Sequence, residues 1–519
     1  MRILIFHGYL LGGTGSNVYN ARLAAALVEL GHEVHLLCQD RQPEQQAFVD
    51  ATGDWEGGTL CVRALREPVR CTAYRPDIGG LLPVYVMDRY EGIQARPFAE
   101  CSEEEVDRYL AANVAAVREV TELVKPDMAL ANHLVMGPVI LARALAGEVP
   151  YAVKVHGSAL EYTVKPNRER FLGLAREGLD GANAVLVGSH HTAASLWEAL
   201  GDPVLVERTR LGPPGVDIAR FAPRAQAEAA EAVRGLGTRL RVDASGSSVA
   251  VDLTAAEMSH GGTEANAFAR DDLAAATALE RLNPGQDRLV AFVGKLIVNK
   301  GVDLLIAAWP LVLRQVPEAK LVVVGFGADR EQLERLLGAL AANDLEGATE
   351  GARRHLRAFL GALRGIERER YLSDAQALSE RVVFTGRLDH EELIELLPAC
   401  EALVVPSTFP EAFGMVAAEG AACGAFPVSA AHSGLAEVSS VLARYIPAEV
   451  AQWLSFAVDD GAVSALGACL TDWLGADPEL RARTREGLVE AVCEHWSWER
   501  VARGVIAAAS GELDDLAVP

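Results

Sequence analysis

The stretch ALVVPSTFPEAFGMVAAEGAACGAFPVSAA, residues 402–431, places an apolar helix between two mostly apolar runs of strand length. The runs are ALVVPS (402–407) and AFPVSAA (425–431), and the helical segment between them is MVAAEGAACG. Continuous apolar strands, without a polar residue at every second position, are typical of parallel sheets covered on both faces. The stretch therefore predicts a βαβ unit.

The same alternation extends outward from this unit over much of the chain. In the N-terminal half, apolar runs of strand length, each followed by a helical pattern, lie at 2–7, 33–39, 128–133, 151–157 and 183–189. In the C-terminal half they lie at 288–296, 320–327 and 382–388, before the two runs quoted above. The pattern predicts an α/β fold with two doubly wound, Rossmann-like domains.

Composition and spacing give the domain boundaries. We expect an N-terminal domain at 1–209, a linker plus insertion at 210–287, a C-terminal domain at 288–490 and a final helical segment at 491–519. The linker is marked by the Gly- and Pro-rich RLGPPGVDIARFAPR. The C-terminal domain contains a charged helical insertion within 340–380. The final helix is amphipathic, with five apolar side chains on one face: Trp496, Trp498, Val501, Val505 and Ile506.

Charge and cysteine content exclude several functions. The 519 residues carry 48 basic and 71 acidic side chains, a net charge of −23, which argues against binding nucleic acid or anionic lipid. The eight cysteines form no C-x-x-C pair, so we expect reduced thiols and no bound metal. We see neither a signal peptide nor a membrane-spanning run. These features predict a cytoplasmic protein, and nothing in them supports membrane association.

Two glutamates mark a candidate binding site in the quoted stretch. Glu411 precedes the helix and Glu419 lies two turns into it. Carboxylates accept hydrogen bonds from vicinal hydroxyls such as those of a ribose or a hexose. The first N–H groups of the helix, from Gly414 to Val416, favour an anion. A helix-start acid and an unrelated surface acid would give the same pattern.

Lysines and glycines at two other strand ends suit a phosphate. Lys295 and Lys300 follow the strand at 288–296, at the edge where open α/β sheets bind ligands. Two solvated surface lysines would look the same. The loop GGTGS, which contains Gly13, lies between the first strand and its helix and lets a ligand approach the backbone. A tight turn without a ligand also explains these glycines.

Two histidines end strands of the N-terminal sheet. His133 ends MALANH and His156 follows YAVKV. Both fall on the carboxyl edge of that sheet, where a polar side chain contacts a ligand or simply ends a strand.

Together these segments resemble the retaining glycosyltransferases of family 4, which have the GT-B fold of two Rossmann-like domains facing each other. The family's Glu-x7-Glu motif resembles PEAFGMVAAEGAACG, and its linker resembles GPPGVDIARFAP. The family's diphosphate segment resembles FVGKLIVNKG, and its C-terminal helix resembles WSWERVARG. The chain departs from the family at Lys295, where Arg is usual, and at Pro214, where Asn is usual. SGLAEV (433–438) is a looser form of another family segment.

The resemblance implies a role for each candidate residue. Glu419 binds the ribose and Glu411 the transferred sugar, while His156 lies over the donor sugar and His133 near the acceptor. The remaining donor contacts are Gly13, Lys295, Lys300, Arg387, Phe413, Gly414, Met415 and Val416, with Arg387 at the nucleobase.

The implied activity is transfer of a hexose from a nucleoside-diphosphate sugar, such as a UDP- or GDP-hexose, to a small-molecule, glycan or lipid-linked acceptor. No separate cofactor is expected, and the sequence does not name the acceptor or the oligomeric state. Two alternatives stay open: a sugar phosphorylase or epimerase of the same fold, and a non-catalytic nucleotide-sugar binding subunit.

Overall fold

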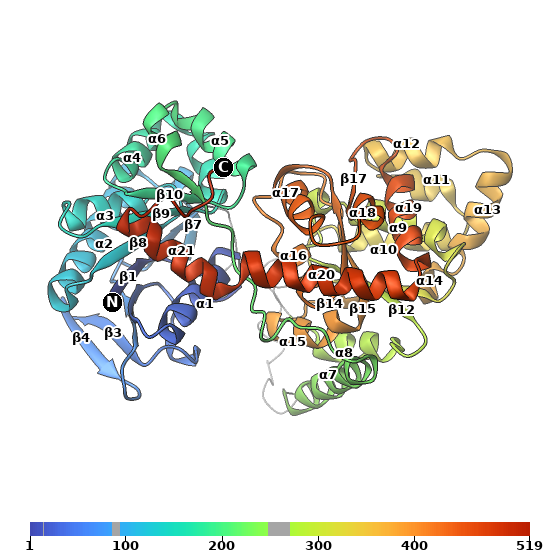
Figure 1. The fold of residues 1–519 in the computed structure, drawn as a ribbon, viewed down its shortest axis with the longest axis horizontal. Helices are drawn as coiled ribbons and strands as arrows, with labels where there is room; N and C mark the ends of the chain where they lie inside the picture. Colours follow the sequence, from blue (N-terminus) through green and yellow to red (C-terminus); the bar gives the residue numbers. More distant parts are fainter. Residues whose placement is uncertain (14, 86–93, 248–269) are drawn as a thin grey trace, which may run out of the picture. The chain divides into compact units, whose positions relative to one another are not determined.

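The computed structural model describes residues 1–13, 15–85, 94–247 and 270–519, which divide into two compact units (Figure 1). Unit 1 comprises Met1–Gly215 and Trp496–Pro519, and unit 2 comprises Val216–His495. The C-terminal segment therefore belongs to the same unit as the N-terminus. Within the described residues, no helix combines the length and the apolar run needed to cross a membrane.

Unit 1 is built on one large sheet. Its described residues form nine strands in the order β11-β10-β9-β8-β1-β2-β5-β3-β4, and only the β3/β4 pair is antiparallel. Their bounds are β1 Arg2–Phe6, β2 Glu33–Leu37, β3 Ala51–Glu56, β4 Thr59–Ala64, β5 Cys71–Arg75, β8 Met128–Asn132, β9 Tyr151–Val155, β10 Ala184–Val187 and β11 Thr209–Leu211. The order reverses between β1 and β8, and this reversal is where doubly wound sheets bind ligands.

Helices cover both faces of this sheet, because alternate residues of each buried strand point to opposite faces. In β1, Leu4 and Phe6 join one apolar cluster, while Ile3 and Ile5 join the other. The first cluster is completed by α2 Glu103–Val124, α3 Gly137–Leu145, α4 Arg168–Asp180 and α5 His190–Leu200. The second is completed by α1 Gly15–Glu29 and α21 Trp498–Ser510. The predicted doubly wound arrangement is confirmed here.

The predicted amphipathic C-terminal helix corresponds to α21, except that Trp496 ends the preceding helix, α20 Pro478–Trp496, and Ser497 separates the two helices. Ser497 caps the N-terminus of α21 by accepting a hydrogen bond from the Arg500 backbone N–H. Its apolar face buries Trp498, Val501 and Val505 against unit 1. The helix packs on α1 and on strands β8, β9 and β10, so the C-terminal segment supplies part of the unit 1 core.

Unit 2 contains a six-stranded parallel sheet in its described residues, ordered β14-β13-β12-β15-β16-β17. The bounds are β12 Arg288–Val293, β13 Ala319–Val324, β14 Val382–Gly386, β15 Cys400–Val405, β16 Phe426–Ala430 and β17 Ser455–Phe456. Counted within the unit, this is the Rossmann order 3-2-1-4-5-6, with its reversal between β12 and β15. The helices nearest the candidate site are α9 Val302–Leu313, α15 His390–Leu396, α16 Met415–Ala422 and α17 Ser433–Leu442.

The segment predicted as linker plus insertion does not form a region of its own. Its start contributes β11 to unit 1, whereas α7 Gln226–Ser247 and α8 Asp272–Glu280 belong to unit 2. These two helices pack on each other, α7 also on α15 and α8 also on β14. Residues 248–269 of the predicted insertion lie outside the described residues. The insertion predicted within 340–380 is helical: α11 Leu345–Thr349, α12 Arg354–Ala362 and α13 Gly365–Ala375.

Candidate functional site

Glu411 lies in the loop between β15 and α16, at the reversal point of the unit 2 sheet. Its carboxylate forms an ion pair with Lys300 and accepts a hydrogen bond of 2.6 Å from Ser407 Oγ. The side chain is 26% exposed, so it is accessible to a ligand. The structure thus brings Lys300 and Glu411 together, although separate roles were predicted for them from the sequence. Of the two predicted lysines, Lys295 is exposed.

A second layer of contacts holds the backbone of this loop. Glu411 N donates to Ser433 Oγ at 2.9 Å, and Gly434 N donates to Glu411 O at 3.0 Å. His432 Nε2 donates to Ser407 O at 2.8 Å, and its Nδ1 lies 3.0 Å from Ser433 Oγ. Ser433 has φ of 51°, a left-handed conformation that is strained for a serine. The segment 433–438, which resembles the family pattern only loosely, therefore positions Glu411 through hydrogen bonds to its backbone.

Glycines bring the lysine loop against the glutamate loop. Gly301 has φ of 64°, and a Cβ there would lie 2.0 Å from Pro406 O, so only glycine allows this approach. The backbone contact is completed by Thr408 N, which donates to Asn299 O at 2.8 Å. Lys300, next to Gly301, reaches Glu411 because these two loops are in contact.

Glu419 is buried in α16, with 4% of its surface exposed. Its Oε1 accepts a hydrogen bond of 2.8 Å from His390 Nε2, at the start of α15. The Phe221 ring lies 4.9 Å from the His390 ring and packs against it. A buried carboxylate with one ring N–H on one oxygen keeps lone pairs for further donors. Sequence reasoning missed His390; its signal is the DHEEL segment that follows the GRL turn.

The N-terminus of α16 has no side-chain cap. Gly414 is the N-cap residue, with φ of 128°, so among the described residues no N-cap side chain accepts from the first N–H groups, those of Met415 and Val416. Phe413, one residue earlier, is buried. The N-terminal end of this helix therefore presents donors and a partial positive charge.

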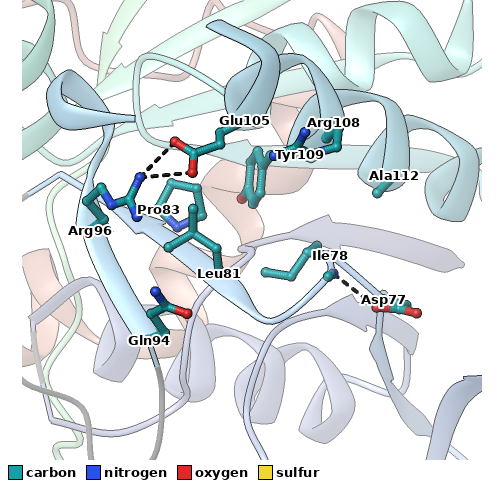
Figure 2. Close-up of a pocket in the computed structure, with 11 residues that line it drawn as sticks. Asp77, Ile78, Leu81, Pro83, Gln94, Arg96, Glu105, Arg108, Tyr109 and Ala112 are labelled. Atoms are coloured by element: carbon teal, nitrogen blue, oxygen red, sulfur yellow. Dashed lines mark hydrogen bonds and ion pairs between the residues drawn. The ribbon is translucent and has the colours of Figure 1, made fainter. Parts of the chain in front are cut away.

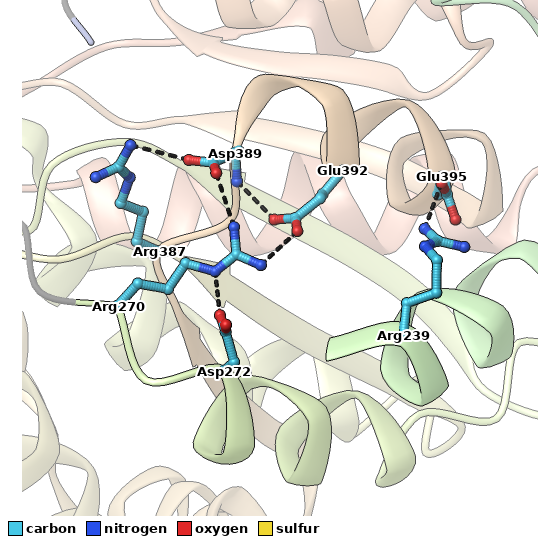
Figure 3. Close-up of polar contacts among 7 residues, drawn as sticks. All are labelled: Arg239, Arg270, Asp272, Arg387, Asp389, Glu392 and Glu395. Carbon is cyan, nitrogen blue, oxygen red and sulfur yellow. Dashed lines mark hydrogen bonds and ion pairs between the residues drawn. The ribbon is translucent and has the colours of Figure 1, made fainter. Parts of the chain in front are cut away.

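Arg387 belongs to an ion-pair network at the start of α15 (Figure 3). Its Nη2 lies 2.9 Å from Asp389 Oδ1, and Asp389 also binds Arg270 Nη1 at 2.7 Å. Arg270 continues to Glu392 Oε1 at 2.5 Å and forms an ion pair with Asp272. This network ties the start of α8 to the turn that carries Arg387 and His390. Sequence reasoning missed Arg270 and Asp389.

Unit 1 has its own polar cluster at the carboxyl ends of β1, β8 and β9. His156 Nε2 donates to Asn132 Oδ1 at 2.8 Å, and the His133 and His156 rings are 5.0 Å apart. Asn20 Nδ2 donates to Asn132 Oδ1 at 3.1 Å and to His7 Nδ1 at 3.0 Å. The structure brings the two predicted histidines together and adds His7, Asn20 and Asn132, which sequence reasoning missed.

Burial keeps these imidazoles neutral. Desolvation lowers the pKa of His7 to about 4 and lowers the pKa of His133 and of His156 well below 6.5. Both ring nitrogens of His133 are buried without a hydrogen-bond partner among the described residues, and its φ is 69°. Burial also lowers the pKa of the neighbouring Lys154 to about 7. At neutral pH all three rings are therefore neutral, and those of His7 and His156 act as neutral hydrogen-bonding groups.

Gly13 lies in the exposed loop after β1, with φ of 94° and open space where a side chain would be. Elsewhere in unit 1, a pocket of about 530 Å³ opens between α2 and the strands β6 Leu81–Val84 and β7 Gln94–Pro97 (Figure 2). Arg96 lines it and binds both oxygens of Glu105 at 2.8 and 2.9 Å (Figure 2). Within the described parts of the chain, no group of three or more His, Cys, Asp or Glu side chains is placed to hold a metal ion.

Two family descriptions match the chain. "Glycosyl transferase 4-like domain" matches residues 14–215, and "Glycosyl transferases group 1" matches 279–345 and 359–443. The chain belongs to glycosyltransferase family 4. The two matches fall on unit 1 and unit 2 respectively, so each Rossmann-like unit of this glycosyltransferase corresponds to one description.

Curated relatives and solved structures agree with this assignment. The chain is 29% identical over 250 residues to a D-inositol 3-phosphate glycosyltransferase of Segniliparus rotundus, covering 48% of this chain and 45% of the relative. It is 29% identical over 248 residues to a GDP-mannose-dependent alpha-(1-6)-phosphatidylinositol monomannoside mannosyltransferase of Mycolicibacterium smegmatis. The match covers 46% of this chain and 51% of the relative. The chain thus spans about half the length of these curated relatives.

Solved structures match nearly the whole chain. Sucrose-phosphate synthase from Thermosynechococcus elongatus has a TM-score of 0.57 at 19% identity, covering 99% of this chain and 98% of the other. The Anabaena protein Alr3699/HepE, solved with UDP and glucose, has a TM-score of 0.56 at 15% identity. The match covers 98% of this chain and 99% of the Anabaena chain. At these identities the likeness shows the fold, which is GT-B as expected from the sequence.

Proposed function

We propose that this glycosyltransferase moves a hexose from a nucleoside-diphosphate sugar to a hydroxyl group of an acceptor, with retention of configuration at the anomeric carbon. The observation that carries the proposal is the pair of carboxylates around the uncapped α16 N-terminus. Glu411 is held by Lys300 and Ser407, and Glu419 is held by His390. A relative whose name specifies GDP-mannose, and a fold neighbour solved with UDP-glucose, support a donor of this class.

In this proposal the donor binds along α16. Glu419 accepts hydrogen bonds from the ribose hydroxyls through the lone pairs that His390 leaves open. The diphosphate meets the N–H groups of Met415 and Val416, with Lys295, Lys300 and Gly13 as further contacts. Glu411 accepts from hydroxyls of the transferred sugar, Arg387 is assigned to the nucleobase, and Phe413 is a further donor contact.

Electrostatic stabilisation of the leaving group then drives the reaction. As the bond between the anomeric carbon and the phosphate oxygen breaks, negative charge grows on the diphosphate. Lysine charge and amide dipoles aimed at that position lower the barrier. Lys300 shares its charge between Glu411 and the phosphate, so donor binding and the position of Glu411 are linked.

Retention is proposed to occur by attack on the same face of the sugar. The acceptor oxygen forms the new bond to the anomeric carbon, and its proton passes to the departing phosphate oxygen. A covalent route needs a carboxylate under the sugar, and the acid nearest His156 in sequence, Glu161, is already bound to Lys165 at 3.0 Å and to Ser195. The neutral His156 ring is proposed to bind the donor sugar, and His133 lies on the acceptor side.

The test is turnover by the purified chain with a panel of nucleoside-diphosphate sugars and polyol acceptors, with the product read by NMR. Release of free nucleoside diphosphate together with an α-linked product from an α-linked donor supports the proposal. A β-linked product would refute retention. Turnover that requires inorganic phosphate would indicate a phosphorylase, and donor binding without turnover by the chain alone would indicate a binding subunit.

A further inference from the structure

A cavity of about 590 Å³ opens in unit 2 at the amino ends of its strands. Arg288 begins β12, Cys400 begins β15, and Cys423 and Gly424 follow the C-terminus of α16; all four residues line the cavity. The proposed donor site lies at the carboxyl ends of the same strands. A strand of six residues spans roughly 20 Å, so the two locations are separated by about the length of the strands.

Positive charge dominates the wall of this cavity. Four arginines line it: Arg224, Arg288, Arg481 and Arg485. Three acids also line it, but Asp287 is bound by Lys320 at 2.8 Å and by Arg381 at 3.2 Å, and Glu318 is exposed to solvent. Glu401 is the remaining acid. The wall of this cavity thus carries more basic than acidic side chains, although the whole chain has a net charge of −23.

One carboxylate serves three of the four arginines. Glu401 Oε2 lies 2.6 Å from Arg485 Nη2, 2.9 Å from Arg481 Nη1 and 3.4 Å from Arg288 Nη2. A carboxylate supplies one negative charge, so about two positive charges remain without a counter-charge. The fourth arginine, Arg224, is half-buried and makes no hydrogen bond or ion pair with any residue of the described ranges.

Donor groups of these arginines are also left over. Arg288 Nη2 and Arg481 Nε are buried, and neither has a hydrogen-bond acceptor among the residues that the structure describes. Buried donors are normally paired, and a buried guanidinium group without a full set of acceptors is costly. A phosphate group supplies several strong acceptor oxygens and negative charge, and the planar guanidinium fork matches it.

We propose that this cavity is a second anion-binding site, separate from the donor site, that takes a phosphate-bearing small molecule. The phosphate lies among Arg224, Arg481 and Arg485 and takes the acceptor role that Glu401 fills only in part. The cavity volume falls in the range of small-molecule sites and leaves room for a group larger than phosphate itself. This inference does not depend on the proposed transferase reaction.

The experiment is titration of the full chain with sodium pyrophosphate at low ionic strength, followed by calorimetry and by thermal unfolding. Arg224→Gln removes a cation that has no internal partner, so the fold is retained and pyrophosphate affinity falls about tenfold or more. Arg354→Gln, an exposed arginine on the same unit, is the matched control and leaves the affinity unchanged. The wild-type affinity also falls as salt is added.

Glu401→Gln gives a change of opposite sign. It removes the internal competitor for the arginines, so pyrophosphate affinity rises while the unliganded protein becomes less stable. A purely structural tether predicts the loss of stability without any gain in affinity. If Glu401→Gln fails to fold, Arg485→Gln replaces it and is expected to lower the affinity.

Lys300→Gln separates this site from the donor site. Pyrophosphate binding that depends on Lys300 belongs to the donor site, and binding that depends on Arg224 belongs to this cavity, so either assignment can fail alone. Unchanged affinity in both Arg224→Gln and Arg485→Gln would overturn the inference. Co-sedimentation with phosphatidylglycerol vesicles that requires Arg224 would place the phosphate on a lipid headgroup. Pyrophosphate binding by a protein that does not co-sediment with these vesicles places the phosphate on a free molecule.

Discussion

The pair of His390 and Glu419 gives a quantitative test of the proposed ribose contact. The perturbation is His390→Leu, which keeps an apolar side chain against Phe221 but removes the ring N–H that lies 2.8 Å from Glu419 Oε1. Glu419 is 4% exposed, so water replaces that donor poorly. A hydrogen bond to a charged group is worth about 1.5–3 kcal/mol, which corresponds to roughly ten- to a hundredfold in affinity.

We expect Glu419→Ala to weaken nucleoside-diphosphate binding by that full factor, because the ribose hydroxyls lose their acceptor. His390→Leu weakens it by about tenfold, because the carboxylate loses the donor that orients it. In the Glu419→Ala background, His390→Leu has little further effect, since the group it orients is gone. The measurement is a calorimetric double-mutant cycle with UDP and with GDP.

The matched control is His355→Leu, in the same unit. His355 Nδ1 also lies 3.0 Å from a carboxylate, that of Asp460, but the Asp460 side chain is 58% exposed. Surface pairs of this kind contribute little, so nucleotide affinity stays at the wild-type value. Additive effects of His390→Leu and Glu419→Ala would refute the coupled role, and an unchanged affinity in Glu419→Ala would refute the ribose assignment.

Four further outcomes are expected. Glu411→Gln lowers kcat more than nucleotide affinity, because Glu411 is assigned to the transferred sugar; equal losses in stopped-flow binding and turnover would contradict this. His156→Ala lowers kcat strongly at unchanged nucleotide affinity, measured by the same assays, because the nucleotide binds unit 2. Activity survives EDTA, since lysine charge meets the diphosphate; loss with EDTA and recovery with manganese would reverse that assignment. The free energy of unfolding of unit 1 falls as the pH drops from about 6.5 to 4, because in this range the histidines bind protons in the unfolded chain, whereas buried His7 and His133 stay neutral in the folded protein. In urea titrations, His133→Phe should show a smaller dependence of this free energy on pH.

Hydrophobic pattern was enough to predict most of the strands that lie inside the two sheets, although β3 and β5 of unit 1 were missed. Runs such as 288–296 and 402–407 are apolar because their strands are buried on both faces, and the structure places β12 and β15 there. The other missed strands are β4 and β11 at the two edges of the unit 1 sheet, the separate β6/β7 pair, and β17 at one edge of the unit 2 sheet. β4 is almost entirely exposed and pairs only with β3, so it has no buried face to impose a pattern.

The candidate site was predictable residue by residue but not as an arrangement. Glu411, Glu419 and Lys300 were identified from their positions at strand and helix ends. Their partners were not, because Lys300 and Glu411 are 111 residues apart and His390 and Glu419 are 29 apart. Contacts at such separations depend on which strands are neighbours in the sheet, and this order is a property of the fold rather than of any local pattern.

Sheet topology also accounts for where the polar groups of each unit collect. In unit 2 the strand order reverses between β12 and β15, and the loops that follow these two strands carry Lys300 and Glu411. In unit 1 it reverses between β1 and β8, and His7 and His133 directly follow those strands. At a reversal the connections on either side leave in opposite directions, so helices do not cover the strand ends and polar side chains can remain there. Substitutions at these four residues should therefore affect ligand binding more than folding, whereas substitutions in the strands that precede them should do the opposite.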